Sequence, residues 1–421
     1  MIVRLGRDFG KLWTAASVST LGDGITVTAG PLLAATLTRD PLLIGVVGAA
    51  SFAPWLLVGL VSGALVDRLD RRRVLWTVDL ARAAVLAALA VAILAGWASI
   101  PLLAGGAFLL GVGQTLFDSA AQASIPSLVG RDPDRLATAN GRLLGAQTVS
   151  QQFAGPPVGG ALFTVAPWLP YAADAASFLG SSVLLARIRG RIAVERTGPP
   201  RSIRADIAEG LRWLVRHRLL RGLAVLTGVL NLVFMAAETV LVLVAQDRLG
   251  LGNVGYGLLL TSTAAGSLLG SLVVGRLTRW WGEAATYLAT LALLIAVLVV
   301  LGLTTLVPAA AVALALLGFA VTVGNVIVQS LRQAVTPGQL LGRVVSVYRL
   351  VGLGAIPAGA LVGGLLGRVD LRLPYLAGAG VLVLVWVPAA LLLRGGTIAR
   401  ARRAAEDAER AYQSGAAAEM G

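Results

Sequence analysis

Long apolar runs dominate this sequence, and they limit its fold more than any other feature. Many stretches of about 20 residues are almost free of charge, and an α-helix of that length crosses a membrane. Of the 421 residues, 57% are hydrophobic and 13% are charged, whereas about 25% are charged in a soluble domain. In lipid only helices and closed barrels satisfy their own backbone, and the alternation typical of a barrel is absent. The sequence therefore predicts an all-α membrane protein.

The runs form two sets of six predicted spans, joined by one long polar linker. We place the first set at about 12–38, 42–66, 74–96, 101–129, 140–165 and 168–188, and the second at about 221–246, 254–277, 283–305, 308–333, 342–367 and 373–394. This predicts an N-terminal six-helix bundle (1–189), a cytoplasmic linker (190–220), a C-terminal six-helix bundle (221–396) and a cytoplasmic tail (397–421). The basic turn at Arg276 and Arg279 repeats the turn at Arg68 and Arg71, which favours two parallel halves.

Basic residues gather on one side of these spans. The side of the termini and linker carries 29 Lys and Arg residues, and the other side carries 4. The positive-inside rule makes the basic side cytoplasmic, so we expect a multi-pass protein of the bacterial inner membrane with both termini in the cytoplasm. Topology explains the net charge of +14, and no nucleic-acid partner is needed.

The composition also excludes several kinds of site. The chain has no cysteine, and its single histidine, His217, lies in a charged segment. Disulfides, thiolate metal sites and histidine proton relays within the membrane are therefore excluded. No P-loop, nucleophile elbow or zinc-binding helix is present, so we expect no enzyme, no cofactor and no metal.

The linker contains apolar residues at helical spacing, at Ile207, Leu211, Leu214 and Val215. This pattern predicts an amphipathic helix on the inner leaflet, with its arginines toward anionic lipid. A solvated connector is the alternative, and the pattern alone does not separate the two.

A polar loop between the second and third spans, GALVDRLDRRR, places two acids and four arginines in seven residues. Its pattern, with Gly63, Asp67, Arg68, Arg71 and Arg72, resembles the loop between helices 2 and 3 of the major facilitator superfamily of transporters. The resemblance implies a conformational latch that holds two six-helix halves together in one state.

One position of this loop departs from the family pattern. The family usually has Gly at the position of Asp70, so we expect a looser turn there. A generic basic loop is the alternative to the latch.

A second motif, GPPVGG, lies in the predicted fifth span. It resembles the helix-5 motif of the antiporter branch of this superfamily at Gly155, Pro156, Gly159 and Gly160. The upstream glycines of that motif are absent, and Gln151 stands at one of their places. The resemblance implies antiport, and an ordinary kinked span is the alternative.

Further short motifs narrow the branch. They are Ser19 to Asp23, Asp118 to Gln122 with Pro126, Ala139-Asn140, and Glu209 to Trp213. In this order they are similar to the macrolide-efflux and enterobactin-exporter type of these transporters. The resemblance covers nearly the whole chain, and it implies proton-driven export of an amphipathic small molecule.

Ionisable residues within spans are candidates for function, because a charge in lipid is costly. Asp23 is our first candidate for proton coupling, followed by Glu238 and Asp118, since a carboxylate can bind a proton and a substrate cation in turn. Gln147 and Gln151 are candidates for the substrate site. Each of these residues could instead form a structural hydrogen bond between helices.

Three other charged residues are assigned to the latch. Asp79 and Arg82 are three residues apart and can pair on one helix face, close to the cytoplasmic end. Arg349 lies about two turns inside the eleventh span, where the region of Asp67 or a cavity aspartate could be its partner. Asp174 is expected near the outer end of its span, at the membrane interface.

The sequence thus predicts a monomeric secondary transporter with two six-helix bundles, whose partners are a small-molecule substrate, protons and the lipid bilayer. Efflux of a drug, macrolide or siderophore by proton antiport is the leading hypothesis. A metabolite importer or uniporter and a lipid-handling membrane protein are the alternatives; a scaffold or sensor fits the two switching motifs poorly.

Overall fold

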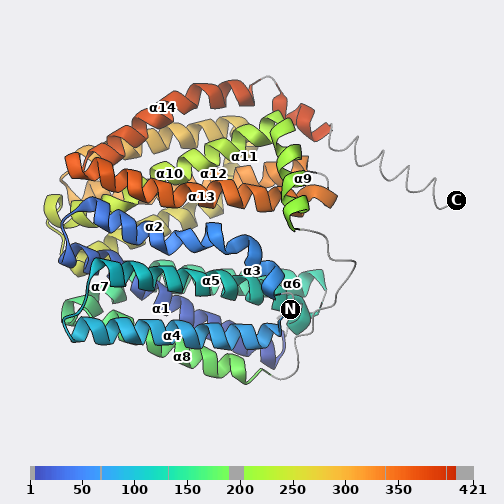
Figure 1. Cartoon of the computed structure of the whole chain (residues 1–421). Helices are drawn as coiled ribbons and strands as arrows, with labels where there is room; N and C mark the ends of the chain where they lie inside the picture. The colour runs from blue at the N-terminus through green and yellow to red at the C-terminus, as the bar shows by residue number, and fades with distance from the viewer. Residues whose placement is uncertain are drawn as a thin grey trace. The chain divides into compact units, whose positions relative to one another are not determined.

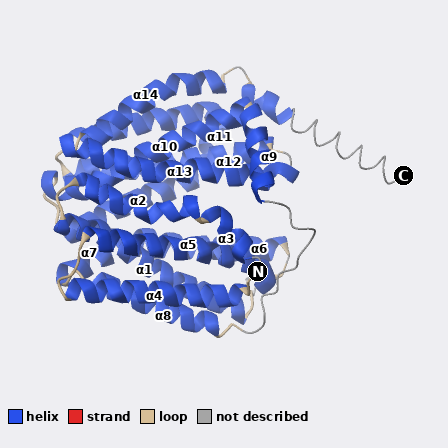
Figure 2. Ribbon diagram, in the orientation of Figure 1, coloured by secondary structure: helices blue, strands red, loops and turns tan. Residues whose placement is uncertain are grey.

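The computed structural model describes residues 5–66, 69–130, 132–188, 203–336, 338–394 and 396–403. Every regular element within these residues is a helix (Figure 2), so the predicted all-α class is confirmed. Two residues of the predicted latch, Asp67 and Arg68, lie outside the described residues, and Gly63 lies in a described helix.

The chain divides into two compact units. Unit 1 contains Met1–Gly198, Ala236–Ala264 and Ala360–Leu371, and unit 2 contains Pro199–Met235, Ala265–Gly359 and Arg372–Gly421. The bundle boundaries inferred from sequence stay a prediction.

Unit 1 is built mainly from the first half of the chain (Figure 1). Its helices are α1 (Arg7–Leu37), α2 (Pro41–Leu57), α3 (Gly59–Val66), α4 (Arg71–Leu94), α5 (Ile100–Val129), α6 (Pro133–Gln147), η1 (Thr148–Ala154), α7 (Gly155–Val165) and α8 (Leu169–Ala186). It also includes the π-helix η2 (Val244–Arg248) and the adjoining ends of three helices from the second half.

Helix starts in unit 1 follow local chemistry. Asp40 caps α2 by accepting a hydrogen bond of 2.9 Å from the Leu42 amide, and Asp132 caps α6 through the Arg135 amide. In both cases proline stands at the first helical position, where its missing N–H costs nothing. These Asp-Pro pairs therefore fix where the two helices begin.

An apolar core holds α1, α4, α5 and α8 side by side (Figure 1). Leu12, Leu75 and Leu185 are fully buried within it. Burying each such side chain contributes about 1.5–3 kcal/mol. This core sets the spacing of the helices that carry the polar residues of the candidate site.

Unit 2 is built mainly from the second half of the chain. Its helices are α9 (Ile203–Arg216), α10 (Arg218–Leu243), α11 (Asn253–Leu303), α12 (Val307–Val335), α13 (Gly338–Val369) and α14 (Leu373–Leu393), of which α10, α11 and α13 continue into unit 1. α11 is two helices joined at Gly282, whose φ of 78° interrupts the helix. The break falls between the two spans predicted at 254–277 and 283–305.

The predicted linker helix is α9. Glu209 forms an ion pair of 2.7 Å with Arg343 of α13, and a Cβ on Gly210 would lie 2.8 Å from the Arg343 carbonyl oxygen. Leu214 is buried. α9 thus packs on the start of α13, and its position on the inner leaflet stays a prediction.

Eight helices in the described residues are long and apolar enough to cross a membrane, and α2 is a shorter apolar helix. One of the eight is the bent α11, which covers two of the predicted spans. The chain is thus a multi-pass helical membrane protein, and the count of twelve spans stays a prediction.

Candidate functional site

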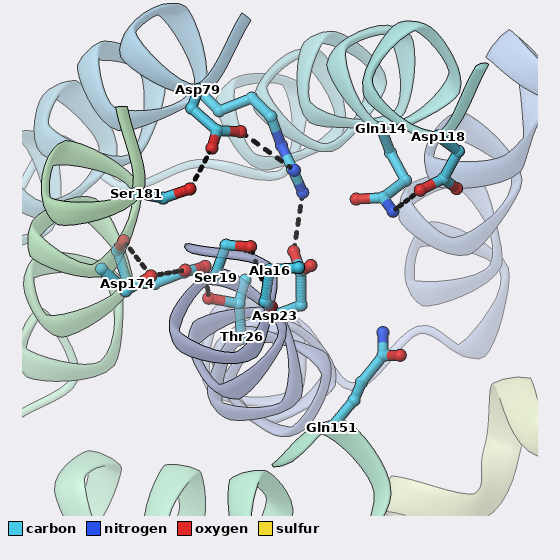
Figure 3. A network of polar contacts seen from close by, with 12 residues as sticks. Ala16, Ser19, Asp23, Thr26, Asp79, Gln114, Asp118, Gln151, Asp174 and Ser181 are labelled. Carbon is cyan, nitrogen blue, oxygen red and sulfur yellow. Dashed lines mark hydrogen bonds and ion pairs between the residues drawn. The ribbon is translucent and has the colours of Figure 1, made fainter. Parts of the chain in front are cut away.

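Polar side chains from α1, α4 and α8 meet inside unit 1 (Figure 3). We call this group the α1–α4–α8 cluster. Its members are Asp23 and Thr26 of α1, Asp79 and Arg82 of α4, and Asp174, Ser177 and Ser181 of α8.

Arg82 is the centre of the cluster. Its Nη2 donates to Asp23 Oδ1 at 2.6 Å, and its Nη1 lies 3.9 Å from Asp79 Oδ1. The side chains of Arg82 and Asp79 are 5% and 0% exposed, and that of Asp23 is 15% exposed. Because ions this deeply buried are costly unless paired, the single guanidinium is what allows the two aspartates to lie there.

The slot around Arg82 is tightly shaped. The guanidinium lies 3.9 Å from the centroid of the Phe178 ring, a cation–π contact. A Cβ on Gly113 of α5 would lie 2.7 Å from Arg82 Cγ, so glycine is needed where the arginine stem crosses α5. Arg82 Nε has no hydrogen-bond partner among the described residues.

The two carboxylates beside Arg82 are held differently. Ser181 Oγ donates to Asp79 Oδ2 at 2.5 Å, whereas Asp79 Oδ1 is buried without a hydrogen bond in the described structure. Asp23 has Arg82 as its close partner on a different helix. Asp79 is thus anchored by one oxygen, and its other oxygen faces Arg82.

Asp174 binds α8 to α1. It is 1% exposed, and it accepts hydrogen bonds from Thr26 Oγ1 at 2.5 Å and Ser177 Oγ at 3.0 Å. A Cβ on Gly22 would collide with its carboxylate. Asp174 is thus buried against the segment of α1 that carries Asp23. Its position at the membrane interface stays a prediction.

The GPPVGG motif lies against α1 beside Asp23. A Cβ on Gly155 would lie 2.5 Å from the Gly24 Cα, and one on Gly159 would lie 2.5 Å from the Ile25 carbonyl oxygen. A Cβ on Gly24 would in turn lie 2.6 Å from the carbonyl oxygen of Gln151. Small residues let backbones approach this closely, so the motif fixes the part of α1 that carries Asp23.

The other face of the motif contacts α11 within unit 1. A Cβ on Gly257 would lie 2.8 Å from the Pro156 carbonyl carbon, and one on Gly160 would lie 2.9 Å from the Asn253 carbonyl carbon. α7 is therefore wedged between α1 and the first residues of α11.

The predicted substrate residues Gln147 and Gln151 are linked to each other. Gln147 Nε2 donates to Gln151 Oε1 at 3.3 Å, and Gln151 lies in η1, a π-helical segment of the kind found frequently at functional sites. In Figure 3 the Gln151 side chain points into the space between Asp23 and Gln114, with no bond drawn to either.

The other two predicted carboxylates stand apart from the Asp23–Arg82 pair. Asp118 of α5 accepts a hydrogen bond of 3.0 Å from Gln114 Nε2. Glu238 of α10 is half-buried. The structure joins Asp23 to Arg82 of α4, and it leaves Asp118 and Glu238 as separate candidates.

The described part of the predicted latch ties helix ends together. Arg71 Nη1 donates to the Ala123 carbonyl of α5 at 2.8 Å, and Arg72 Nη2 donates to the Ala186 carbonyl at the end of α8. Asp70 accepts from the Arg72 amide at 3.0 Å and so caps α4. The carboxylate stabilises the helix start. The expected loosening of the turn stays a prediction, because Asp67 and Arg68 lie outside the described residues.

The remaining latch residues were Asp79, Arg82 and Arg349. The predicted Asp79–Arg82 pair is present, but the closest carboxylate to Arg82 is Asp23. Arg349 is exposed on α13. Their role in a latch stays a prediction, and the partnership of Arg82 with Asp23 is what sequence reasoning missed.

A second arginine–aspartate pair lies at the surface of unit 1. Arg368 donates to Asp40 through two bonds of 2.7 and 2.5 Å, and Arg39 Nη1 donates to Gln246 at 2.8 Å. The hydrogen bonds from Arg368 lower the pKa of the Asp40 carboxyl below its ordinary value of 3.8. This forked pair joins the start of α2 to the end of α13.

The sequence of this chain is similar to the sequences of known membrane transporters. Residues 6–410 match the family described as transmembrane secretion effectors, of the major facilitator superfamily. The chain belongs to this family, which resembles the enterobactin-exporter branch expected from sequence. It is therefore a major facilitator transporter and not an enzyme.

Two relatives illustrate the match. The multidrug efflux pump Tap of Mycolicibacterium fortuitum is 30% identical over 394 residues, which cover 90% of this chain and 94% of Tap. The MFS-type transporter y4rN of Sinorhizobium fredii is 26% identical over 365 residues, covering 84% and 87%.

Solved structures share the fold. The nucleoside transporter NupG has a TM-score of 0.73 at 11% identity, with 93% of this chain and 100% of NupG covered. A bacterial homologue of the iron transporter ferroportin has a TM-score of 0.70 at 18% identity, covering 92% and 99%. These similarities establish the major facilitator fold and nothing about the substrate.

Proposed function

We propose that this protein exports an amphipathic small molecule, such as a drug, macrolide or siderophore, in exchange for protons. It would act by alternating access of two six-helix halves in the bacterial inner membrane, with both termini cytoplasmic. The observation that carries the proposal is the Asp23–Arg82 ion pair of 2.6 Å between two long helices. The printed name of the relative Tap, a multidrug efflux pump, supports efflux.

Exchange follows from competition at one carboxylate. An ionised Asp23 attracts Arg82 or a cationic group of the substrate, and a protonated Asp23 attracts neither strongly. The side chain is 15% exposed, so Asp23 is the most exposed member of the Asp23–Arg82–Asp79 group. A ligand shifts a conformational equilibrium only by its difference in affinity for the two states, and this competition provides such a difference for both proton and substrate.

The contacts of α1 connect the protonation of Asp23 to the movement of neighbouring helices. Asp23 lies between Gly22, which adjoins Asp174, and Gly24, which adjoins Gln151. A change in the charge of Asp23 therefore acts on a segment of α1 that contacts α7 on one side and α8 on the other. We propose that the GPPVGG motif converts this local change into movement of α7 against α11.

The test is transport by the purified protein in proteoliposomes with an imposed pH gradient. Tetraphenylphosphonium and erythromycin serve as cationic and macrolide probes. We expect gradient-driven transport of at least one probe by the wild type, abolition by a protonophore, and loss of gradient-driven transport in Asp23→Asn.

Asp134→Asn is the matched control, because it removes an exposed carboxylate from the first turn of α6. Gradient-driven transport that is unchanged in Asp23→Asn would remove Asp23 from the mechanism, and loss in Asp118→Asn alone would move the coupling site to α5. Transport that a protonophore does not affect would favour a uniporter instead. Movement of labelled phospholipid by the wild type would favour lipid handling.

A further inference from the structure

We infer that Asp79 is the second docking position for Arg82, so that the guanidinium moves from Asp23 to Asp79 when Asp23 binds a proton. Asp79 would thus be a positioning residue for proton exchange, acting through Arg82. The inference rests on the proposed function for its role in transport, and on geometry alone for the movement itself.

The first ground is the unused oxygen of Asp79. Its Oδ1 is buried without a hydrogen bond in the described structure and lies 3.9 Å from Arg82 Nη1. A charge-assisted bond has a length of about 2.8 Å, so a shift of roughly 1 Å completes the pair. A buried acceptor without a partner is costly, and this acceptor lies within a small side-chain movement of a donor.

The second ground is the way the surroundings guide that movement. The Arg82 stem is confined by Gly113, where a Cβ would lie 2.7 Å from Cγ, and the guanidinium lies over Phe178. The stem is thus held while the planar end group can tilt. Ser181 fixes Asp79 through its other oxygen, so the second docking position is in place before Arg82 arrives.

The third ground is which helices each pair joins. Asp23–Arg82 joins α1 to α4, whereas Asp79–Arg82 lies within α4 at a spacing of three residues. Moving Arg82 to Asp79 therefore releases α1 from α4 without leaving the buried guanidinium unpaired. Protonation of Asp23 thereby breaks the contact between α1 and α4.

The proton balance of the step is simple. Asp23 takes one proton from solution and becomes a neutral carboxylic acid, while Arg82 keeps its charge because a guanidinium does not deprotonate in proteins. Asp79 stays ionised and gains the ion pair. On proton release the steps reverse, and no other group gains or loses a proton.

Other charged groups near the pair do not offer a second position. Asp174 of α8 accepts from Thr26 and Ser177, and Asp118 of α5 accepts from Gln114. η1 contributes the neutral Gln151. Among the described residues, Asp79 is the carboxylate other than Asp23 that forms an ion pair with Arg82.

The experiment compares Asp79→Asn with Ser181→Ala. Ser181→Ala removes the hydrogen bond to Asp79 but leaves the carboxylate, so it reports a purely structural role. Asp79→Glu tests rescue. All variants are purified in detergent and their proton uptake is titrated as the pH is lowered, which requires no transport.

In Asp79→Asn we expect proton uptake to require lower pH than in the wild type, because Asp23 is then the one carboxylate partner of Arg82 among the described residues and Arg82 competes with the proton for it. Ser181→Ala keeps the Asp79 carboxylate but loosens it, so it should shift the titration less than Asp79→Asn does. Asp79→Glu should titrate close to the wild type. Identical titration of Asp79→Asn and the wild type would overturn the inference, as would an equal shift in Ser181→Ala.

In proteoliposomes, kcat for gradient-driven probe transport should fall about tenfold or more in Asp79→Asn, because release of α1 now leaves a buried charge unpaired. KM should change little, since the Asp79 side chain is 0% exposed. A wild type that shows no gradient-driven transport but the expected titration shift would refute the proposed function and leave Arg82 exchange standing. A KM change without a kcat change would overturn the inference.

Discussion

Two arginine–aspartate pairs of unit 1, Asp23–Arg82 and Asp40–Arg368, have similar short bonds and different surroundings. In the Asp23–Arg82 pair the side chains are 15% and 5% exposed, and in the Asp40–Arg368 pair they are 28% and 46% exposed. Water screens the second pair and can replace either partner, whereas the first has few substitutes for its charges. Protonation of Asp40 weakens its contact with Arg368, whose charge remains solvated. Protonation of Asp23 leaves the buried Arg82 without its closest countercharge.

The largest effect should come from removing the buried cation. Arg82→Gln leaves Asp23 and Asp79 without a countercharge, and breaking a buried pair costs about 3–5 kcal/mol. Thermal unfolding of the purified protein in detergent measures the loss. Arg368→Gln is the matched control, because it removes the same group from the exposed pair and should cost much less. Equal losses in the two variants would mean that burial does not distinguish the pairs.

An intermediate effect should follow from Gly24→Ala. The new Cβ would lie 2.6 Å from the Gln151 carbonyl oxygen, and such overpacking costs about 1–3 kcal/mol. It should also impair gradient-driven transport, since it separates α1 from the GPPVGG motif. Gly10→Ala, on the same helix, is the control because its Cβ would meet nothing within 4 Å. If Gly24→Ala and Gly10→Ala have the same stability and the same transport rate, the close packing of α1 against Gln151 contributes to neither.

The smallest effect should come from Asp40→Asn. Arg368 lowers the pKa of Asp40 from 3.8, so the pair contributes stability above that value and loses it as the pH falls through the lowered pKa. At neutral pH we expect a loss of about 0.2–1 kcal/mol that shrinks as salt is added.

The measurement for Asp40→Asn is the melting temperature of the variant and the wild type across acidic pH and rising salt. The two should converge in acid. A difference that persists in acid or in high salt would place this pair in the same class as the buried one.

The sequence predicted the parts of the fold that depend on local pattern. Apolar runs marked the helices, the break at Gly282 fell between two predicted spans, and GPPVGG identified a region of close helix packing. Asp23 was selected because a charge within an apolar span is costly, which makes such a residue a candidate for function.

The sequence could not show what depends on the rotation and contact of helices far apart in the chain. Arg82 was assigned to its neighbour Asp79 by spacing, but its closest partner lies 59 residues away. Asp174 was expected close to the outer end of its span, and its position in the sequence could not show that it contacts Thr26 of α1. Arg82 and Asp174 interrupt apolar runs, as Asp23 does. Considering the three residues together would have predicted that they meet inside the bundle.

The most direct test of the central claim is the release of protons when substrate binds. Purified protein in weakly buffered detergent solution, at a pH where the titration shows Asp23 to be protonated, is mixed with tetraphenylphosphonium or with the strongest substrate found in the transport assay, and the pH is recorded. Competition at Asp23 predicts proton release by the wild type and its loss in Asp23→Asn, with Asp134→Asn unchanged. Equal proton release by the wild type and Asp23→Asn would contradict the account.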